Sequence, residues 1–254
     1  ESLSSLCFSG PDDALKLTAN TQPAILTVSV AAHAVFSKRF AHKPSFVAGH
    51  SLGEYSALVA AGALSLADAV RAVRARGTFM QEAVPAGVGA MAAVLGLDAD
   101  KIKAVCLESA AGEVVSCANF NEPSQTVIAG HAGAVARASD ALKAAGAKRV
   151  LPLPVSAPFH CALMQPVVPR LETVLRQVQW HALQTPVVTN VEATANADSA
   201  RTVDLLLKQV TGSVRWVECV QALEKSGVTH VVELGPGKVL CGLVKRIAKG
   251  IECV

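Results

Sequence analysis

A serine in the pentapeptide Gly49-His50-Ser51-Leu52-Gly53 has the setting of a nucleophile for acyl transfer. The pentapeptide follows the apolar run 46–48 and precedes the helix-like stretch 54–61. A strand, then Gly-x-Ser-x-Gly, then a helix is typical of a nucleophile elbow. We expect both glycines to be needed, since side chains beside a sharp turn would clash. The Ser51 hydroxyl would then lie at a helix N-terminus, where the Leu52 N–H can stabilise an oxyanion. The alternative is a plain glycine-rich turn.

A serine nucleophile needs a base, and His160 is the candidate. It lies in the loop 156–161, which follows a predicted strand, and active-site residues gather in loops that leave strand ends. The alternative is a structural histidine in a proline-containing loop. His50 adjoins Ser51, but adjacent residues at a turn point in different directions. No acid announces itself as a third member of a triad, and a Ser–His dyad held by a backbone carbonyl would explain this.

Arg76 is the third candidate because it borders the apolar stripe of a predicted helix. Its helical neighbours are Val73 and Met80. Arginine beside a core is costly unless an anion pairs with it. One interpretation is a bidentate clamp for a substrate carboxylate. The other is an internal salt bridge to Glu54 or Glu82.

The order of the predicted elements indicates an α/β protein. Residues 88–155 are predicted as strand, helix, two strands, helix and strand, which is the order of a ferredoxin-like unit. We therefore expect a discontinuous large domain, 1–87 and 156–254, with 88–155 inserted as a small subdomain. Alternating strands and helices in the large domain predict a hydrolase-like, mainly parallel, doubly wound sheet. The segments expected there are helices 21–40, 65–83, 167–178, 203–209 and 216–226, a last helix ending near 249, and strands 46–49, 185–190 and 229–234.

Composition narrows the class of protein further. The 254 residues are 51% hydrophobic and 17% charged, which predicts a substantial core. A net charge of +3 is too balanced to argue for nucleic-acid binding. Seven cysteines without CxxC spacing predict reduced thiols, no metal site and a cytoplasmic location. No apolar run is long enough to span a membrane, and no signal peptide is visible. Gly235-Pro236-Gly237-Lys238 lacks the spacing of a phosphate loop and predicts a strand-to-helix turn.

Taken together, several motifs resemble the malonyl-CoA:acyl carrier protein transacylases of fatty acid synthesis and the related acyltransferase domains of polyketide synthases. The resemblance covers essentially the whole chain. It rests on Gly-His-Ser-Leu-Gly-Glu-Tyr-Ser-Ala-Leu at 49–58, Arg-Gly-Thr-Phe-Met-Gln-Glu-Ala-Val at 76–84, Gly-Ala-Met-Ala-Ala-Val at 89–94, Asn-Phe-Asn at 119–121, Val-Ile-Ala-Gly-His at 127–131, Leu-Pro-Val-Ser-Ala-Pro-Phe-His-Cys-Ala-Leu-Met at 153–164 and Glu-Leu-Gly-Pro-Gly-Lys-Val-Leu at 233–240.

The resemblance implies a role for each matching residue. Ser51 would form the acyl-enzyme, His160 would be the base, and Arg76 would pair with the malonyl carboxylate. The backbone carbonyl of Gln209 would hold His160, and the Leu52 N–H would face the oxyanion. Phe159 and Leu52 resemble the malonyl-selective pattern. Residues expected to contact the substrate are Arg76, Phe159, Met80 and Asn119.

The resemblance also implies a substrate, a partner and an absent cofactor. Malonyl-CoA would be the donor and the phosphopantetheine thiol of acyl carrier protein the acceptor, with no permanently bound cofactor. The protein would be a monomer. Because such carriers are acidic, Lys245, Arg246 and Lys249 on the last helix would form a docking face, the alternative being a solvated helix face.

One departure from the family pattern leaves other functions open. The family begins with a strand and a Gly-Gln-Gly turn whose glutamine N–H completes the oxyanion hole, and this sequence, which starts at Glu1, contains no such motif. We expect that this segment has been truncated or omitted, because loss of one such donor costs about 10²–10³ in rate. The alternatives are a serine thioesterase or hydrolase, and a truncated, inactive remnant that binds CoA or carrier protein.

Overall fold

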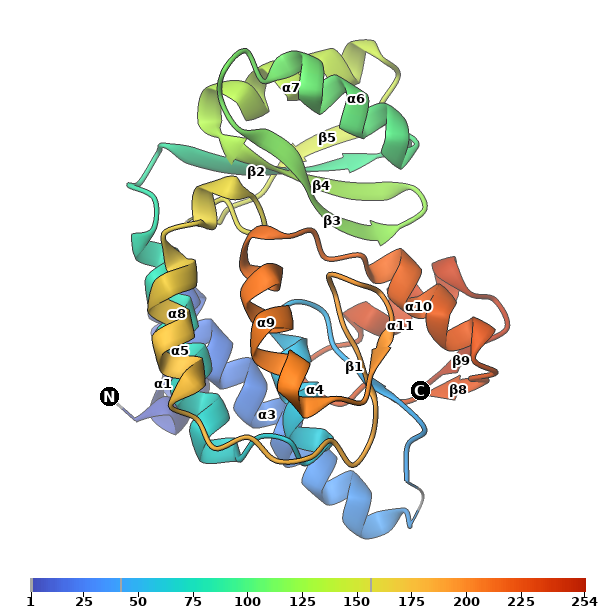
Figure 1. Cartoon of the computed structure of the whole chain (residues 1–254). Coiled ribbons are helices and arrows are strands. Elements are labelled where there is room, and N and C mark those ends of the chain that lie inside the picture. The colour runs from blue at the N-terminus through green and yellow to red at the C-terminus, as the bar shows by residue number, and fades with distance from the viewer. Residues whose placement is uncertain (1, 42, 156) are drawn as a thin grey trace.

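The structure, a computed structural model, describes residues 2–41, 43–155 and 157–254 (Figure 1). Glu1, His42 and Ser156 lie outside the described residues, and so does the expected resumption of the large domain at Ser156. The described helices are α1 (Leu3–Ser9), α2 (Asp12–Lys16), α3 (Thr18–Arg39), α4 (Gly53–Ala60), α5 (Leu66–Glu82), α6 (Ala99–Ser109), α7 (Ala132–Ala144), α8 (Val167–Arg176), α9 (Thr202–Thr211), α10 (Trp216–Lys225) and α11 (Val239–Ile247), with short 3₁₀ turns η1 (Ala162–Met164) and η2 (Ser199–Arg201).

The described strands form three separate sheets. Strands β3 (Val115–Glu122), β4 (Gln125–His131), β2 (Gly89–Leu95) and β5 (Arg149–Pro152) make an antiparallel sheet in that order. A mixed sheet has the order β1 (Val47–Ala48), β6 (Val187–Val188) and β7 (Ala195–Asn196). The last sheet is the parallel pair β8 (His230–Val231) and β9 (Glu252–Cys253).

The four-stranded sheet has two buried faces, as the two-residue period of a strand requires. Ala92 and Val94 pack with α6 and α7, which cover the upper face in Figure 1. Met91 and Ala93 point to the opposite face and pack with Cys161 and Phe159, which lie in the loop after β5. The element order from β2 to β5 is the β-α-β-β-α-β order that the sequence predicts. The loop that carries His160 therefore packs against the face of this sheet that is not covered by α6 and α7.

The prediction of one mainly parallel sheet for the remaining residues is wrong. β1 pairs in parallel with β6, but β6 pairs antiparallel with β7, and β8 belongs to a different sheet. The strands are also shorter than expected, since 185–190 and 229–234 shrink to two residues each. The backbone segments around β1 and β8 both line a cavity of about 860 Å³, which is also bordered by α3, α4 and α11. The two strands thus border the same cavity but belong to different sheets.

Helix α5 presents the face that carries Arg76 to the interior. Ser65 caps the start of the helix, because its Oγ accepts a hydrogen bond from the Asp68 N–H at 3.0 Å. The buried stripe of α5 packs against α3 and α8. Apolar side chains surround that stripe and make the main core, among them Leu26, Tyr55, Leu58, Val73, Met80, Leu171 and Leu206. Arg76 lies within this stripe and is therefore held in the interior.

The C-terminal segment corrects two expectations. Cys241 and Cys253 are joined by a disulfide, whereas the sequence predicts only reduced thiols. Helix α11 and strand β9 bring the Cα atoms of the two cysteines to 5.3 Å from each other, a separation that a disulfide can span. The spacing of the cysteines in the sequence does not reveal this proximity. In addition, α11 ends at Ile247, so Lys249 lies beyond the helix on which the docking face was expected.

Candidate active site

The turn between β1 and α4 has the geometry of a nucleophile elbow. Ser51 has φ of +52°, a left-handed conformation that is rare for a residue with a side chain and is found at functional turns. A Cβ on Gly49 would lie 2.0 Å from the backbone of Gly53, so the turn requires glycine there. A Cβ on Gly53 would meet nothing within 4 Å. The expectation that both glycines are needed is thus correct for Gly49 and wrong for Gly53.

A chain of hydrogen bonds joins Ser51 to His160 and Gln209. Ser51 Oγ lies 2.7 Å from His160 Nε2, and His160 Nδ1 lies 2.8 Å from the backbone oxygen of Gln209. A carbonyl oxygen can only accept, so Nδ1 carries the hydrogen and the lone pair of Nε2 faces the serine hydroxyl. This tautomer can accept the proton of Ser51.

Packing against two cores holds His160 in reach of Ser51. Phe159 packs against the main core and also against the face of the four-stranded sheet that carries Met91 and Ala93. Cys161 is buried on that same face. The Cys161 thiol donates to the Pro158 carbonyl at 3.1 Å, which closes the turn. His160 itself has φ of +57° and is 4% exposed. The loop therefore fixes the imidazole rather than leaving it to rotate.

The imidazole of His160 is electrically neutral over the physiological pH range. Burial and, to a smaller extent, the nearby positive charge of Arg76 lower the pKa of His160 to about 3, although the hydrogen bond to Gln209 acts in the opposite direction. Because the folded-state pKa lies below the ordinary value of 6.5, the ring remains neutral as the pH falls through that value. It is available as a proton acceptor throughout.

Arg76 is buried beside the serine without a carboxylate partner among the described residues. It is 2% exposed, and its Nη2 lies 3.2 Å from Ser51 Oγ. The guanidinium donates to two neutral side-chain oxygens, Gln22 Oε1 at 2.8 Å and Gln209 Oε1 at 2.9 Å. Of the two acids considered as salt-bridge partners, Glu82 pairs with Arg170, and Glu54 accepts from Gln209. A fixed positive charge thus lies next to the nucleophile, where it can attract an anion.

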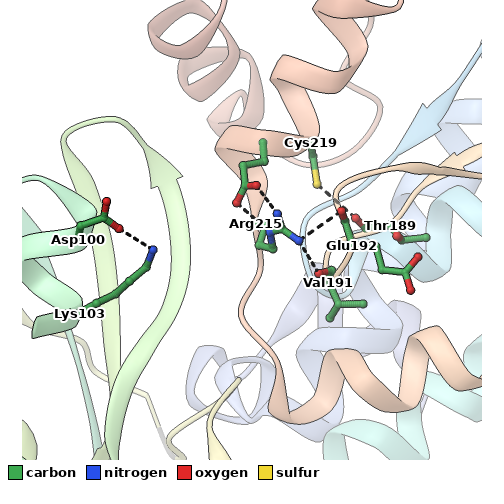
Figure 2. Close-up of polar contacts among 8 residues, drawn as sticks. Asp100, Lys103, Thr189, Val191, Glu192, Arg215 and Cys219 are labelled. Carbon is green, nitrogen blue, oxygen red and sulfur yellow. Dashed lines mark hydrogen bonds and ion pairs between the residues drawn. The ribbon is translucent and has the colours of Figure 1, made fainter. Parts of the chain in front are cut away.

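A buried asparagine holds the elbow and was not predicted. Asn190 Oδ1 accepts from the Ser51 N–H at 2.6 Å, and its Nδ2 donates to the Gly49 carbonyl at 2.8 Å. Arg215 fixes the turn after Asn190, since its Nη1 donates to the carbonyls of Val191 and Glu192 at 3.1 and 3.3 Å (Figure 2). Asn190 thereby bridges the backbone of Gly49 and Ser51 across the strained turn.

The remaining histidine near the serine serves a different contact. His50 Nε2 lies 2.8 Å from Asn121 Oδ1 on β3, and its ring lies 5.6 Å from that of Trp216. Burial lowers the pKa of His50. His50 therefore links the elbow to the four-stranded sheet and does not contact the Ser51 hydroxyl.

The other residues expected at the site, Leu52, Met80 and Asn119, make no direct contact with Ser51 Oγ or with the His160 ring among the described hydrogen bonds. Leu52 is the N-cap residue of α4, and its N–H donates to no group among the described residues. Met80 is buried and accepts a 3.8 Å contact from Gln22, the residue that also holds Arg76. Asn119 is buried on β3, where its backbone bridges to Val214. The large cavity is lined by His50 and Leu52 but not by Ser51, Arg76 or His160.

The expected docking residues are exposed but are not equivalent. Lys245 and Arg246 lie in the last turn of α11. Arg246 is already paired, with its Nη1 2.6 Å from Glu122 Oε2 on β3. Lys249 is exposed beyond the helix end. The three cations therefore do not form a single helical face.

The described part of the chain contains neither a candidate membrane-spanning helix nor a cluster of metal-binding side chains. No helix there is both long and apolar enough to cross a bilayer. No group of three or more His, Cys, Asp or Glu side chains is arranged to hold a metal ion within those same ranges.

Comparison with known proteins identifies the family. The profile of the acyl transferase domain matches residues 2–249. Malonyl CoA-acyl carrier protein transacylase of Salmonella typhimurium is 53% identical over 238 residues, covering 94% of this chain and 77% of that protein. The crystal structure of an acyl carrier protein S-malonyltransferase from Vibrio cholerae has a TM-score of 0.97 at 49% identity, covering 99% of this chain and 82% of the other.

A further solved structure contains a carrier protein. It is a type II PKS acyl-carrier protein in complex with its malonyl-transacylase, which has a TM-score of 0.96 at 47% identity and covers 99% of this chain and 81% of that one. The chain belongs to the malonyl CoA-acyl carrier protein transacylase family of acyl transferase domains.

The elbow geometry predicts different effects for its two glycines. Gly49→Ala should destabilise the fold by about 3 kcal/mol, because the new methyl group meets the Gly53 backbone. This corresponds to a fall in melting temperature of roughly 10 °C. Gly53→Ala is the matched control, and it should leave the melting temperature unchanged or slightly raised, since alanine favours a helix start over glycine. Equal melting temperatures for the two variants in a thermal scan would contradict the described turn.

Proposed function

We propose that this chain transfers a malonyl group from malonyl-CoA to the phosphopantetheine thiol of an acyl carrier protein through a malonyl-Ser51 intermediate. The observation that carries the proposal is the position of Arg76. Its guanidinium is 3.2 Å from the nucleophilic oxygen and has no carboxylate partner among the described residues. A malonyl thioester brings the missing carboxylate within reach of the carbon that the serine attacks.

In the first half of the reaction, Ser51 is acylated. His160 takes the hydroxyl proton as Oγ attacks the thioester carbon, and the Leu52 N–H stabilises the oxyanion. The carbon–sulfur bond then breaks, and the proton on His160 passes to the sulfur of CoA. The products are malonyl-Ser51 and free CoA, with His160 neutral again.

In the second half, the carrier thiol is the nucleophile. His160 takes the thiol proton as sulfur attacks the malonyl-serine carbonyl, and it returns that proton to Ser51 Oγ as the ester bond breaks. Arg76 holds the free carboxylate through both halves, so the acyl group keeps one pose. No permanently bound cofactor takes part, because phosphopantetheine belongs to the carrier.

Three further residues are proposed to shape the acyl pocket. Phe159 precedes His160 and packs on both cores, which makes it a rigid wall. Met80 contacts Gln22 and so supports the residue that holds Arg76. Asn119 is proposed as a polar contact for substrate from β3.

The chain is proposed to consist of two units that work together as a monomer. Residues 88–155 would be a ferredoxin-like subdomain inserted into a large hydrolase-like domain, 1–87 and 156–254. The support is the element and strand order of the four-stranded sheet. A monomer suffices because Ser51, His160 and Arg76 all come from one chain.

A cytoplasmic location is proposed on the basis of the thiols. Five cysteines (Cys7, Cys106, Cys117, Cys161 and Cys219) are unpaired, which suits a reducing compartment. The Cys241–Cys253 disulfide is not explained by that location.

Radiolabelled malonyl-CoA distinguishes the proposed transfer from hydrolysis and from mere binding. We expect label on Ser51 in a peptide map, stable in buffer and discharged by holo acyl carrier protein. In His160→Ala the acylation rate should fall by about 10²–10⁴-fold. Loss of label to water without a carrier would identify a thioesterase. Absence of label would identify a protein that binds without reacting, and either result would refute the proposal.

The clamp predicts a change of selectivity. Arg76→Ala should lower kcat/KM for malonyl transfer by between about 10-fold and about 100-fold, the value of a charged hydrogen-bonded pair. Acetyl transfer should be kept or increased, because acetyl has no carboxylate to place. Arg71→Ala on the exposed side of the same helix is the control and should change neither rate. Equal loss of both transfers in Arg76→Ala would exclude the clamp.

Docking of an acidic carrier is proposed at Lys245, Arg246 and Lys249. Lys245 is the sharpest probe because it has no ion-pair partner among the described residues, unlike Arg246. Lys245→Glu should raise KM for the carrier several-fold and leave KM for malonyl-CoA unchanged. Steady-state kinetics with each substrate varied in turn would measure this, and an unchanged carrier KM would place docking elsewhere.

A further inference from the structure

Glu54 is a buried carboxyl one helical turn after the nucleophile. It is 2% exposed, in the first turn of α4. A single oxygen, Oε2, accepts two hydrogen bonds, from Gln209 Nε2 at 2.8 Å and from the Asn190 N–H at 3.0 Å. Burying a carboxylate is costly, so these contacts need a reason beyond filling space.

The two partners of Glu54 are the two residues that hold the reacting pair. Asn190 binds the Ser51 N–H and the Gly49 carbonyl, which fixes the elbow. Gln209 holds His160 through its backbone oxygen. Its side-chain Nε2 also donates to the Ser51 carbonyl at 3.0 Å. One oxygen of Glu54 therefore links Asn190, which holds the elbow, to Gln209, which holds His160.

The chemistry of the Gln209 amide turns this contact into a directional one. A primary amide has a donor at one end and an acceptor at the other, whereas a carboxylate can only accept. Glu54 therefore selects the orientation with Nε2 toward itself and Oε1 toward Arg76, where Nη2 donates at 2.9 Å. The reversed amide would present N–H to the guanidinium and lose both contacts.

We propose that Glu54 is a positioning residue for malonyl transfer, whose carboxylate orients the Gln209 amide so that Oε1 holds Arg76 beside Ser51. The proposal rests on the proposed function, in which Arg76 binds the malonyl carboxylate. It assigns Glu54 no contact with substrate.

The carboxylate form of Glu54, which orients the Gln209 amide, predominates above about pH 7. Burial raises the pKa of Glu54 to about 7, while the hydrogen bonds from Asn190 and Gln209 and the charge of Arg76 act to lower it. The charged or titratable groups that face it are Arg76 on α5, Tyr55 on α4 and Cys219 on α10. Arg76 is the cation of this set, and it is linked to Glu54 through the Gln209 amide rather than by a direct ion pair.

A positioning role and a purely structural role predict different kinetics for Glu54→Gln. The new amide can offer N–H to Gln209, which allows the Gln209 amide to reverse and release Arg76. Malonyl kcat/KM should fall by between about 10-fold and about 100-fold, and acetyl transfer by less than about 3-fold. A structural role would lower both rates by the same factor. Glu82→Gln, an exposed acid paired with Arg170, is the control and should change neither rate.

A substrate-free measurement separates failure of this proposal from failure of the proposed function. In arginine-labelled protein, the Nη signals of Arg76 should be resolved in wild type, because both amino groups are hydrogen-bonded, and averaged by rotation in Glu54→Gln. If wild type transfers no malonyl group, the function is wrong, but this NMR comparison still decides the role of Glu54. Unchanged Arg76 signals in Glu54→Gln would overturn it.

Discussion

The hydrogen bond from His160 Nδ1 to the backbone oxygen of Gln209 is the contact on which the rest of the site depends. It fixes the tautomer of the imidazole and turns Nε2 toward Ser51. A main-chain carbonyl is neutral, so it orients the ring without adding a negative charge. A carboxylate in this place would raise the pKa of His160 and would also neutralise Arg76. The neutral acceptor therefore keeps the base uncharged and keeps the cation available to substrate.

Neutral hydrogen-bond acceptors likewise surround Arg76. Two glutamine side chains hold its guanidinium through neutral oxygens, and a nearby acid, Glu54, acts through the Gln209 amide. The arginine is thus fixed in place while its charge stays uncompensated at the serine. An anionic acyl group is the kind of ligand that this arrangement favours, and an acid-containing hydrolase triad is the kind of site that it does not resemble.

The sequence predicts those site residues that lie in a recognisable local motif. It does not predict residues whose role depends on contacts between distant segments. Gly-x-Ser-x-Gly locates Ser51 because the elbow needs a strand, a turn and a helix in immediate succession. His160 and Arg76 were only candidates on local grounds, and the family resemblance made them specific. Asn190 and Gln22 carry no such signature, since a single polar residue next to apolar neighbours gives no hint of its partner. The split of the sheet and the Cys241–Cys253 bond likewise depend on how distant segments meet.

The ionisation state of His160 tests the central claim most directly. Protein labelled with ¹⁵N-histidine can be followed by NMR at about pH 5.5, well below the ordinary pKa of histidine. The account predicts a neutral ring protonated on Nδ1, with an unprotonated Nε2 that shifts when Ser51 is changed to alanine. A doubly protonated imidazolium at this pH, or a ring protonated on Nε2, would contradict it.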